Sequence, residues 1–296
     1  MRIGIIQKII DVIRMKKNVP PLFILDKLMN KIYTFEQKKE QIDTIALGSS
    51  HCEYGFRASE KQMNLGISYQ DLYYSYQIYK KYNNKNIKNV VIFYSVFSPG
   101  YQLIKTNDAY LAIAFKIICN IPYQDCKIAE NLNLEKLEKY YLNKYKKTIN
   151  NFAFNAKYSG NEEKYESFFN NVTAEQRAIP HYKNNQRHNN QNQYLGYISE
   201  VAKQYNQKIY IIIPPATQEY KKLLPSSEEL FSELYDTAQN LDNLQVINCY
   251  DISFDKNEFV DWDHLGLKGA ERLTKIINDN MAKTRMAAVG SKIYEL

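Results

Sequence analysis

An apolar run that stops at a glycine and two serines, T-I-A-L-G-S-S-H over residues 44–51, decides the fold class predicted for this chain. The apolar segment 43–47 is a predicted strand, and Gly48 marks its end. The hydroxyl of Ser50 would then lie at the carboxyl end of that strand, with a helix beginning directly behind it. A unit of strand, turn and helix is typical of parallel sheets that helices cover.

Four further apolar segments are predicted strands, and helical patterns separate them. The strands are 61–65, 90–96, 208–213 and 244–249. The helices are 70–82, 108–119, 134–147, 193–205, 226–241 and 267–282. Apolar strands that alternate with helices favour a parallel sheet with helices on both faces. We therefore expect an α/β fold with a central parallel sheet of about five strands, and functional groups at the carboxyl ends of the strands.

The segments that flank this sheet divide the chain into three predicted parts. Residues 1–40 form a helical extension, 41–283 the α/β domain, and 284–296 a C-terminal tail. Within the domain, the polar segment 157–193 lacks clear periodicity, so we expect a long loop or lid there.

Residues 3–17 have the pattern of an amphipathic helix, in which basic side chains flank an isoleucine stripe. The stripe consists of Ile6, Ile9, Ile10 and Ile13, and the cations are Lys8, Arg14, Lys16 and Lys17. Such a helix either packs on its own domain, which we favour, or lies on an anionic membrane surface.

Composition and charge limit the classes of partner. The net charge of +7 comes without an RNP, zinc-finger or helix-turn-helix signature, so nucleic acid is not an expected partner. The four cysteines form no C-x-x-C pair and no zinc spacing, and we expect neither a metal nor a cofactor. No apolar run approaches the length of a membrane span, and the N-terminus does not have the pattern of a signal peptide. We expect a cytoplasmic protein, whose membrane contact, if residues 1–17 make one, is peripheral at the inner face.

A second informative string, D-W-D-H over residues 261–264, lies just before the last predicted helix. It offers a carboxylate, Asp261, three positions before an imidazole, His264. A serine hydroxyl is a weak nucleophile unless a base takes its proton, and a third group usually orients that base. Ser50, His264 and Asp261 can supply these three parts. Each string alone is more simply explained by helix capping, and only their combination favours acyl-transfer chemistry.

Together these blocks resemble the SGNH/GDSL hydrolase superfamily. The first block, L-G-S-S-H, gives Ser50 the role of nucleophile, and the last, D-W-D-H, makes Asp261 and His264 its partners. The second block, N-L-G-I-S, matches Gly66 to an oxyanion-hole glycine, which would act together with the backbone N–H of Ser50. The resemblance implies a flavodoxin-like three-layer sandwich, a covalent acyl-enzyme and no cofactor.

The chain departs from the family pattern at two of its blocks. G-S-S-H replaces G-D-S-L, and this variant resembles the bacterial branch that modifies cell-surface polysaccharides. The G-x-N-D block, whose asparagine donates to the oxyanion, is replaced by Y-S-V-F-S-P-G, so Ser95, Ser98 or backbone N–H groups would have to substitute. Further candidates for substrate contact are His51, Trp262, Arg187 and His188, and His181 in the same polar segment, although a core or solvated role is the simpler alternative for several of them.

Two functions remain open from the sequence. The first is a serine esterase or O-acyltransferase that acts on O-acyl groups, most plausibly acetyl, of a bacterial surface glycan, its precursor or another small ester; a transferase would also need an acyl donor that the sequence does not identify. The second is a partner protein of polysaccharide biosynthesis that keeps the fold without catalysis. The absent asparagine favours the second function, whereas the intact serine, aspartate and histidine favour the first.

Overall fold

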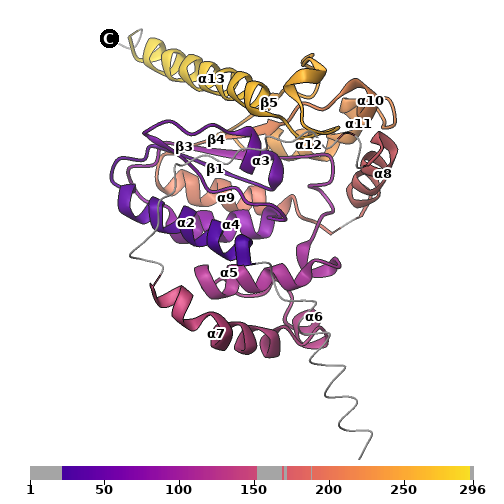
Figure 1. Cartoon of the computed structure of the whole chain (residues 1–296). Helices are drawn as coiled ribbons and strands as arrows, with labels where there is room; N and C mark the ends of the chain where they lie inside the picture. Colours follow the sequence, from indigo (N-terminus) through magenta and orange to yellow (C-terminus); the bar gives the residue numbers. More distant parts are fainter. Residues whose placement is uncertain (1–21, 152–168, 170–171, 188, 294–296) are drawn as a thin grey trace, which may run out of the picture. The chain divides into compact units, whose positions relative to one another are not determined.

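A computed structural model describes residues 22–151, 169, 172–187 and 189–293 of the chain (Figure 1). The predicted helix over residues 3–17 lies outside the described residues. The described residues fall into two compact units, one from the segments up to 36 and 102–158, the other from 37–101 and 159–296. The division predicted at residues 40 and 283 groups the chain differently and stays a prediction.

The first unit is helical and contains most of α2 (Leu22–Lys38). Its other helices are α5 (Ala112–Cys119), α6 (Cys126–Asn131) and α7 (Leu134–Asn151), preceded by the 3-10 turns η1 (Leu103–Lys105) and η2 (Ala109–Leu111). Helix α7 contacts both α5 and α6. No helix among the described residues is both long and apolar enough to cross a membrane.

The second unit, which we call the sheet unit, is built on five parallel strands in the order β2-β1-β3-β4-β5. The strands are β1 (Thr44–Leu47), β2 (Gln62–Asn64), β3 (Asn89–Phe93), β4 (Lys208–Ile213) and β5 (Leu244–Asn248). This strand order is the flavodoxin-like doubly wound pattern. The predicted α/β fold with a five-stranded parallel sheet is therefore confirmed.

Helices cover both faces of this sheet (Figure 1). On one face lie α3 (Ser50–Gly55) and α13 (Leu267–Ile293), and on the other α4 (Leu72–Tyr82) and α9 (Gln193–Gln204). Alternate strand residues point to opposite faces, and those towards α3 and α13 join one core cluster. That cluster includes Ala46, Val91, Phe93, Tyr210, Ile212, Leu273 and Ile277. Because both faces are buried, the central strands β1, β3 and β4 are nearly continuous apolar runs rather than alternating patterns.

The segment expected to be a polar loop contains helix α8 (Ala174–Asn185). Thr173 caps it through a capping box, in which the Thr173 side chain and Gln176 satisfy each other's backbone N–H groups. Ala178 is the buried residue of this helix, so the sequence has no apolar stripe to reveal it. Short helices α10 (Gln218–Lys221), α11 (Ser227–Leu230) and α12 (Ser232–Gln239) follow β4, and the predicted helix 226–241 is interrupted at Phe231.

Candidate active site

The turn between β1 and α3 presents Ser50 at the carboxyl end of the sheet. Gly48 has a φ of +139°, and a Cβ there would lie 2.9 Å from the Cβ of Phe93, so the turn requires glycine. Ser49 is extended and precedes the helix, which makes Ser50 its first residue. The N–H of Ser50 has no hydrogen-bond partner among the residues that the structure describes. Ser50 therefore combines a half-buried hydroxyl with an available backbone donor.

Ser50, His264 and Asp261 form one chain of hydrogen bonds. Nε2 of His264 lies 2.7 Å from Oγ of Ser50, and Nδ1 lies 2.8 Å from Oδ2 of Asp261. An ionised carboxylate only accepts, so Nδ1–H donates to Asp261 and Nε2 accepts the Ser50 hydroxyl. The structure thus brings together the three residues that the sequence singled out from strings more than two hundred positions apart.

Backbone hydrogen bonds within the loop that carries Asp261 and His264 hold its two ends together. Phe259 and Leu265 pair as an antiparallel bridge, and the N–H of Val260 donates to the carbonyl of His264 over 3.0 Å. Oδ1 of Asp261 also accepts the backbone N–H of His264 over 2.7 Å. One carboxylate therefore fixes the turn and orients the imidazole at the same time.

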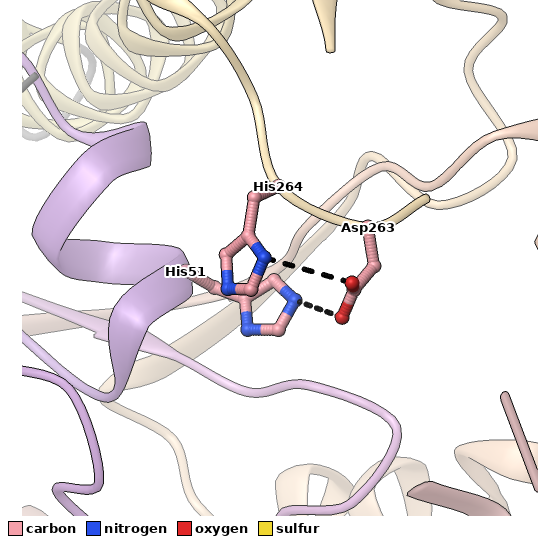
Figure 2. Close-up of side chains that lie close together, drawn as sticks. All are labelled: His51, Asp263 and His264. Carbon is pink, nitrogen blue, oxygen red and sulfur yellow. Dashed lines mark hydrogen bonds and ion pairs between the residues drawn. The ribbon is translucent and has the colours of Figure 1, made fainter. Parts of the chain in front are cut away.

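A second carboxylate, Asp263, lies in the middle of the site and was not a candidate from the sequence. Its side chain is 3% exposed. Oδ2 lies 3.0 Å from Nε2 of His51 and 3.4 Å from Nδ1 of His181, while Oδ1 accepts from Nε of Arg177 over 2.8 Å. Oδ1 is also 3.6 Å from Nδ1 of His264, as Figure 2 shows. The only sequence signal for it was that an acidic residue directly precedes His264.

His51 lies inside the site rather than at its surface. Its ring stacks on that of His264, with centroids 4.7 Å apart and planes at 23° (Figure 2). Nε2 faces Asp263, and Nδ1 lies 3.5 Å from Oγ of Ser49. Because both ring nitrogens face protein groups, the predicted substrate contact of His51 stays a prediction without support from its position.

Helix α8 contributes two more groups, Arg177 and His181. Nη2 of Arg177 lies 3.0 Å from Nδ1 and 3.4 Å from Nε2 of His264. Since Nδ1 carries a proton that it donates to Asp261, it cannot accept from Arg177, and the guanidinium lies beside the ring without a hydrogen bond to this nitrogen. Nδ1 of His181 is 2.8 Å from the hydroxyl of Tyr220 in α10. Arg177 and His181 belong to the segment predicted as a loop or lid; His181 was a candidate for substrate contact, whereas Arg177 was not a candidate.

Both ends of α8 are attached to the sheet unit. Before its N-terminus, the indole Nε1–H of Trp262 donates to the carbonyl of Val172 over 2.7 Å. Near its C-terminus, Nδ2 of Asn185 donates to the carbonyl of Val96 over 2.7 Å. A Cβ on Gly100 would lie only 1.8 Å from the carbonyl oxygen of Asn184, so the close approach here depends on glycine. Trp262 thus anchors α8 to the D-W-D-H loop.

Burial is the largest cause of the pKa shifts of the His264 and His181 imidazoles. Loss of hydration lowers the pKa of His264 to about 4, although the charges of Asp263 and Asp261 oppose this. Burial likewise lowers the pKa of His181 to about 3. Burial alone would raise the pKa of Asp261, but its hydrogen bond to His264 and the charge of that ring outweigh this effect and lower it to about 2. At neutral pH, His264 is therefore an unprotonated base beside ionised carboxylates.

The N–H of Gly66, expected to donate to an oxyanion, donates to Oδ1 of Asn64 over 3.0 Å in this structure. Nδ2 of Asn64 in turn donates to the carbonyls of Cys52 and Phe56, over 2.8 Å each. Asn64 thereby fastens the end of β2 to α3, a role that the sequence did not reveal. A Cβ on Gly66 would lie 2.6 Å from the side chain of Cys52. The oxyanion role of Gly66 stays a prediction.

The contacts of Ser95 and Ser98 do not bring either hydroxyl to Ser50. Oγ of Ser98 accepts the backbone N–H of Ser95 over 2.8 Å. Oγ of Ser95 is buried without a partner among the described residues, and it lines a cavity of about 10 Å³ together with His51 and Asp263. Arg187 is exposed beyond the end of α8, and His188 lies outside the described residues. Oxyanion or substrate contact by these residues stays a prediction.

Within the described part of the chain, one cluster has the ligand spacing of a metal site. It consists of His51, Asp263 and His264, whose ligand atoms lie within 4.8 Å of one another. Nδ1 of His264, however, is engaged by Asp261, and the guanidinium of Arg177 lies 3.0 Å from it. Nε2 of His264 is likewise engaged by the hydroxyl of Ser50, so neither ring nitrogen of His264 is available as a metal ligand. We assign no metal to it.

Comparison with known proteins adds little to this geometry. No family model and no curated protein sequence matches the chain. Among solved structures, it is similar to a "putative acylhydrolase" from Bacteroides fragilis, with a TM-score of 0.41 and 13% identity over 84% of this chain and 94% of the other. It is also similar to a "GDSL-like lipase" from Bacteroides thetaiotaomicron, with a TM-score of 0.40 and 13% identity over 86% and 98% of the two chains. Likeness at this level assigns no activity to this chain.

Proposed function

We propose that this chain is a serine-dependent acyl-transfer enzyme of the SGNH type. The observation that carries the proposal is the continuous hydrogen-bond chain from Ser50 Oγ through His264 to Asp261, with lengths of 2.7 and 2.8 Å. These are the contacts that a nucleophile, its base and the group that orients the base require. The low pKa of His264, about 4, supports the role of base, because the ring is ready to accept a proton at neutral pH.

In the first half-reaction, Oγ of Ser50 attacks the carbonyl carbon of an ester while its proton moves to Nε2 of His264. Asp261 holds the opposite nitrogen and stabilises the imidazolium that forms. The bond from the carbonyl carbon to the leaving alcohol then breaks, and the alcohol oxygen takes the proton back from Nε2. The acyl group stays on Ser50, and the ring is neutral again.

In the second half-reaction, a hydroxyl compound replaces the departed alcohol. Water gives hydrolysis, and a sugar hydroxyl gives transfer; each loses its proton to Nε2 as its oxygen attacks the acyl carbon. Ser50 then leaves as the alcohol and recovers its proton from the ring. Both outcomes use the same acyl-enzyme, so an esterase and an O-acyltransferase share this site.

The negative charge on the carbonyl oxygen needs donors in either case. The N–H of Ser50, at the start of α3 and without a partner among the described residues, is the donor that we favour. The N–H of Gly66 would join it only if Asn64 released it. One such donor contributes about 2.7–4 kcal/mol of transition-state stabilisation. The rate of acyl transfer therefore depends strongly on whether a second donor is present.

The substrate that we propose is an O-acyl group, with acetyl favoured, on a bacterial surface glycan or its precursor. The support is the resemblance of the G-S-S-H block to the branch that modifies surface polysaccharides. The location that fits this substrate is the cytoplasm, and a membrane contact through residues 1–17 would be peripheral at the inner face.

A second function, a partner protein of polysaccharide biosynthesis without catalysis, is favoured by two specific contacts. The N–H of Gly66 is used by Asn64, and Arg177 lies 3.0 Å from a ring nitrogen of His264, where its charge disfavours an imidazolium. The hydrogen bond between Ser50 and His264 opposes this alternative, because a non-catalytic protein does not require a serine hydroxyl bonded to an imidazole.

Turnover of an aryl acetate distinguishes the two functions. We expect the wild-type chain to release the phenol and to carry a transient acetyl group on Ser50, visible by intact-mass analysis. Ser50→Ala removes both signals, whereas Ser59→Ala, at an exposed serine, retains them. Turnover that is equal in Ser50→Ala and wild type contradicts the proposal. Release of acetate from O-acetylated oligosaccharides, with and without sugar acceptors, then separates esterase from transferase.

A further inference from the structure

The site contains two imidazole–carboxylate pairs rather than one. His264 pairs with Asp261 at 2.8 Å, and His51 pairs with Asp263 at 3.0 Å. The two rings are stacked, with centroids 4.7 Å apart and only 23° between their planes. The reaction proposed above uses the first pair, whereas the second pair has no role in it so far.

The ring of His51 packs against two other rings. The ring of His264 is stacked on it, and the ring of Phe97 lies tilted to it with its centroid 5.7 Å away. His51 is 7% exposed, and its nitrogens face Asp263 and Ser49. A side chain so enclosed does not suit contact with a substrate, but it provides a fixed flat surface against which another ring can rest.

The carboxylate of Asp263 is surrounded by polar side chains that also lie beside the two rings. A buried carboxylate is strongly unfavourable unless several donors compensate it. Here Arg177, His51 and His181 lie within 3.4 Å of its oxygens. Its Oδ1 is 3.6 Å from Nδ1 of His264, close enough for its charge to act on the proton that His264 accepts.

The charges in this cluster balance only when an imidazole is protonated. Asp261 and Asp263 contribute two negative charges and Arg177 one positive charge. The further groups that face His264 or these carboxylates are His51 and Tyr54 from α3, His181 from α8, and Tyr220 from α10. Asp261, Asp263 and Arg177 together carry one excess negative charge, and a proton on His264 cancels it.

We propose that His51 and Asp263 are positioning residues for His264: the stacked His51 ring fixes the plane of the base, and the Asp263 carboxylate balances its charge when it takes the proton from Ser50. The inference rests on the proposed function, in which His264 is the base. Neither residue touches the reacting atoms, so both act through His264.

Nitrogen-15 NMR of the imidazoles in the full chain tests this without requiring activity. We expect Asp263→Asn to move the titration of His264 to lower pH by about one unit or more, because a nearby negative charge is lost. Asp242→Asn is the matched control, since Asp242 is exposed and pairs with Lys203 away from the site; it should leave the titration unchanged. A His264 titration that is the same in Asp263→Asn and wild type overturns the charge-balancing role.

The stacking role has its own readout, the proton on Nδ1 of His264 that is bonded to Asp261. We expect this resonance to broaden in His51→Ala and to be restored in His51→Phe, which returns a flat ring without returning the hydrogen bond to Asp263. A sharp resonance in His51→Ala overturns the role in positioning.

Labelling of Ser50 by a fluorophosphonate separates this inference from the proposed function. We expect the labelling rate to fall about tenfold or more in Asp263→Asn and His51→Ala, since small misplacements of a catalytic group are costly. Wild type that is not labelled contradicts the proposed function, and the NMR results then decide the positioning inference alone. Wild type that is labelled, with both variants labelled equally fast, contradicts the positioning inference alone.

Discussion

Nε of Arg177 donates to Oδ1 of Asp263 over 2.8 Å, and this ion pair joins helix α8 to the loop that carries His264. Asp263 is almost fully buried, whereas the Arg177 side chain is 31% exposed. The pair therefore lies at the boundary between the buried cluster and solvent. The same guanidinium, through Nη2, reaches the ring of His264. Changes to Arg177 should be visible in the behaviour of the base.

Arg177→Ala should raise the pKa of His264 from its low value of about 4. The substitution removes a positive charge 3.0 Å from the ring and leaves Asp263 without its strongest cation, and both effects favour the protonated ring. The rate at which a fluorophosphonate labels Ser50 should fall as pH decreases, and the pH at which this fall begins (the acid limb) should therefore be higher in Arg177→Ala. Arg177→Lys keeps the charge and should move it less. An acid limb that stays in place in Arg177→Ala contradicts the electrostatic role of Arg177.

The buried imidazoles should make the fold sensitive to mild acid. The pKa of His264 is lowered to about 4 and that of His181 to about 3, from an ordinary value of 6.5. Below 6.5 the unfolded chain therefore binds protons that the folded chain does not, so stability falls as pH decreases towards 4. His264 alone accounts for roughly 3 kcal/mol over that range.

Urea denaturation at a series of pH values measures this loss. His181→Phe should show a shallower dependence, because one of the two imidazoles no longer titrates. A free energy of unfolding that is constant between pH 6.5 and 4 contradicts the burial of neutral imidazoles.

Gly100→Ala should displace the C-terminal end of α8. The new Cβ would lie 1.8 Å from the carbonyl oxygen of Asn184 and 2.5 Å from that of Arg187, and backbone on both sides leaves no flexible group to give way. We expect faster amide hydrogen exchange in α8 and slower labelling of Ser50. Gly196→Ala is the matched control, since no atom lies within 4 Å of the Cβ position there. Unchanged exchange in Gly100→Ala contradicts the close packing.

Asn64→Ala should destabilise the turn that carries Ser50. It leaves buried carbonyls of Cys52 and Phe56 without their donor, at a cost of about 1–3 kcal/mol. It also releases the N–H of Gly66, so the rate per folded molecule should not fall in parallel with stability. Denaturant midpoints and labelling rates measure the two effects separately. Stability equal to wild type contradicts the structural role of Asn64.

The sheet could be predicted because the pattern that identifies each central strand lies within one short stretch of sequence. Strands such as β1 and β4 are continuous apolar runs that stop at glycine or proline, and burial on both faces makes them distinct from the helices. The helices with an apolar face, such as α4 and α9, were equally visible. Helix α8 was not, because one buried alanine gives no periodicity.

The candidate site was predictable only in part, for a similar reason. Ser50, Asp261 and His264 stand in strings whose spacing carries chemistry. Asp263, Arg177 and His181 do not, since their meeting depends on where α8 and its capping box place a polar segment. The occupation of the Gly66 N–H by Asn64 likewise follows from the geometry at the end of β2, which no local pattern encodes.

The central claim is that Ser50 is a nucleophile activated by His264, and reaction with a fluorophosphonate, followed by intact-mass and peptide analysis, tests it most directly. The account predicts one adduct on Ser50 in wild type and in Ser59→Ala, a change at an exposed serine, and a labelling rate reduced at least about a thousandfold in Ser50→Ala and His264→Ala. It also predicts that labelling slows as pH falls towards the pKa of His264, about 4. Labelling of Ser50→Ala or His264→Ala at the wild-type rate, or no labelling of wild type at all, would contradict it.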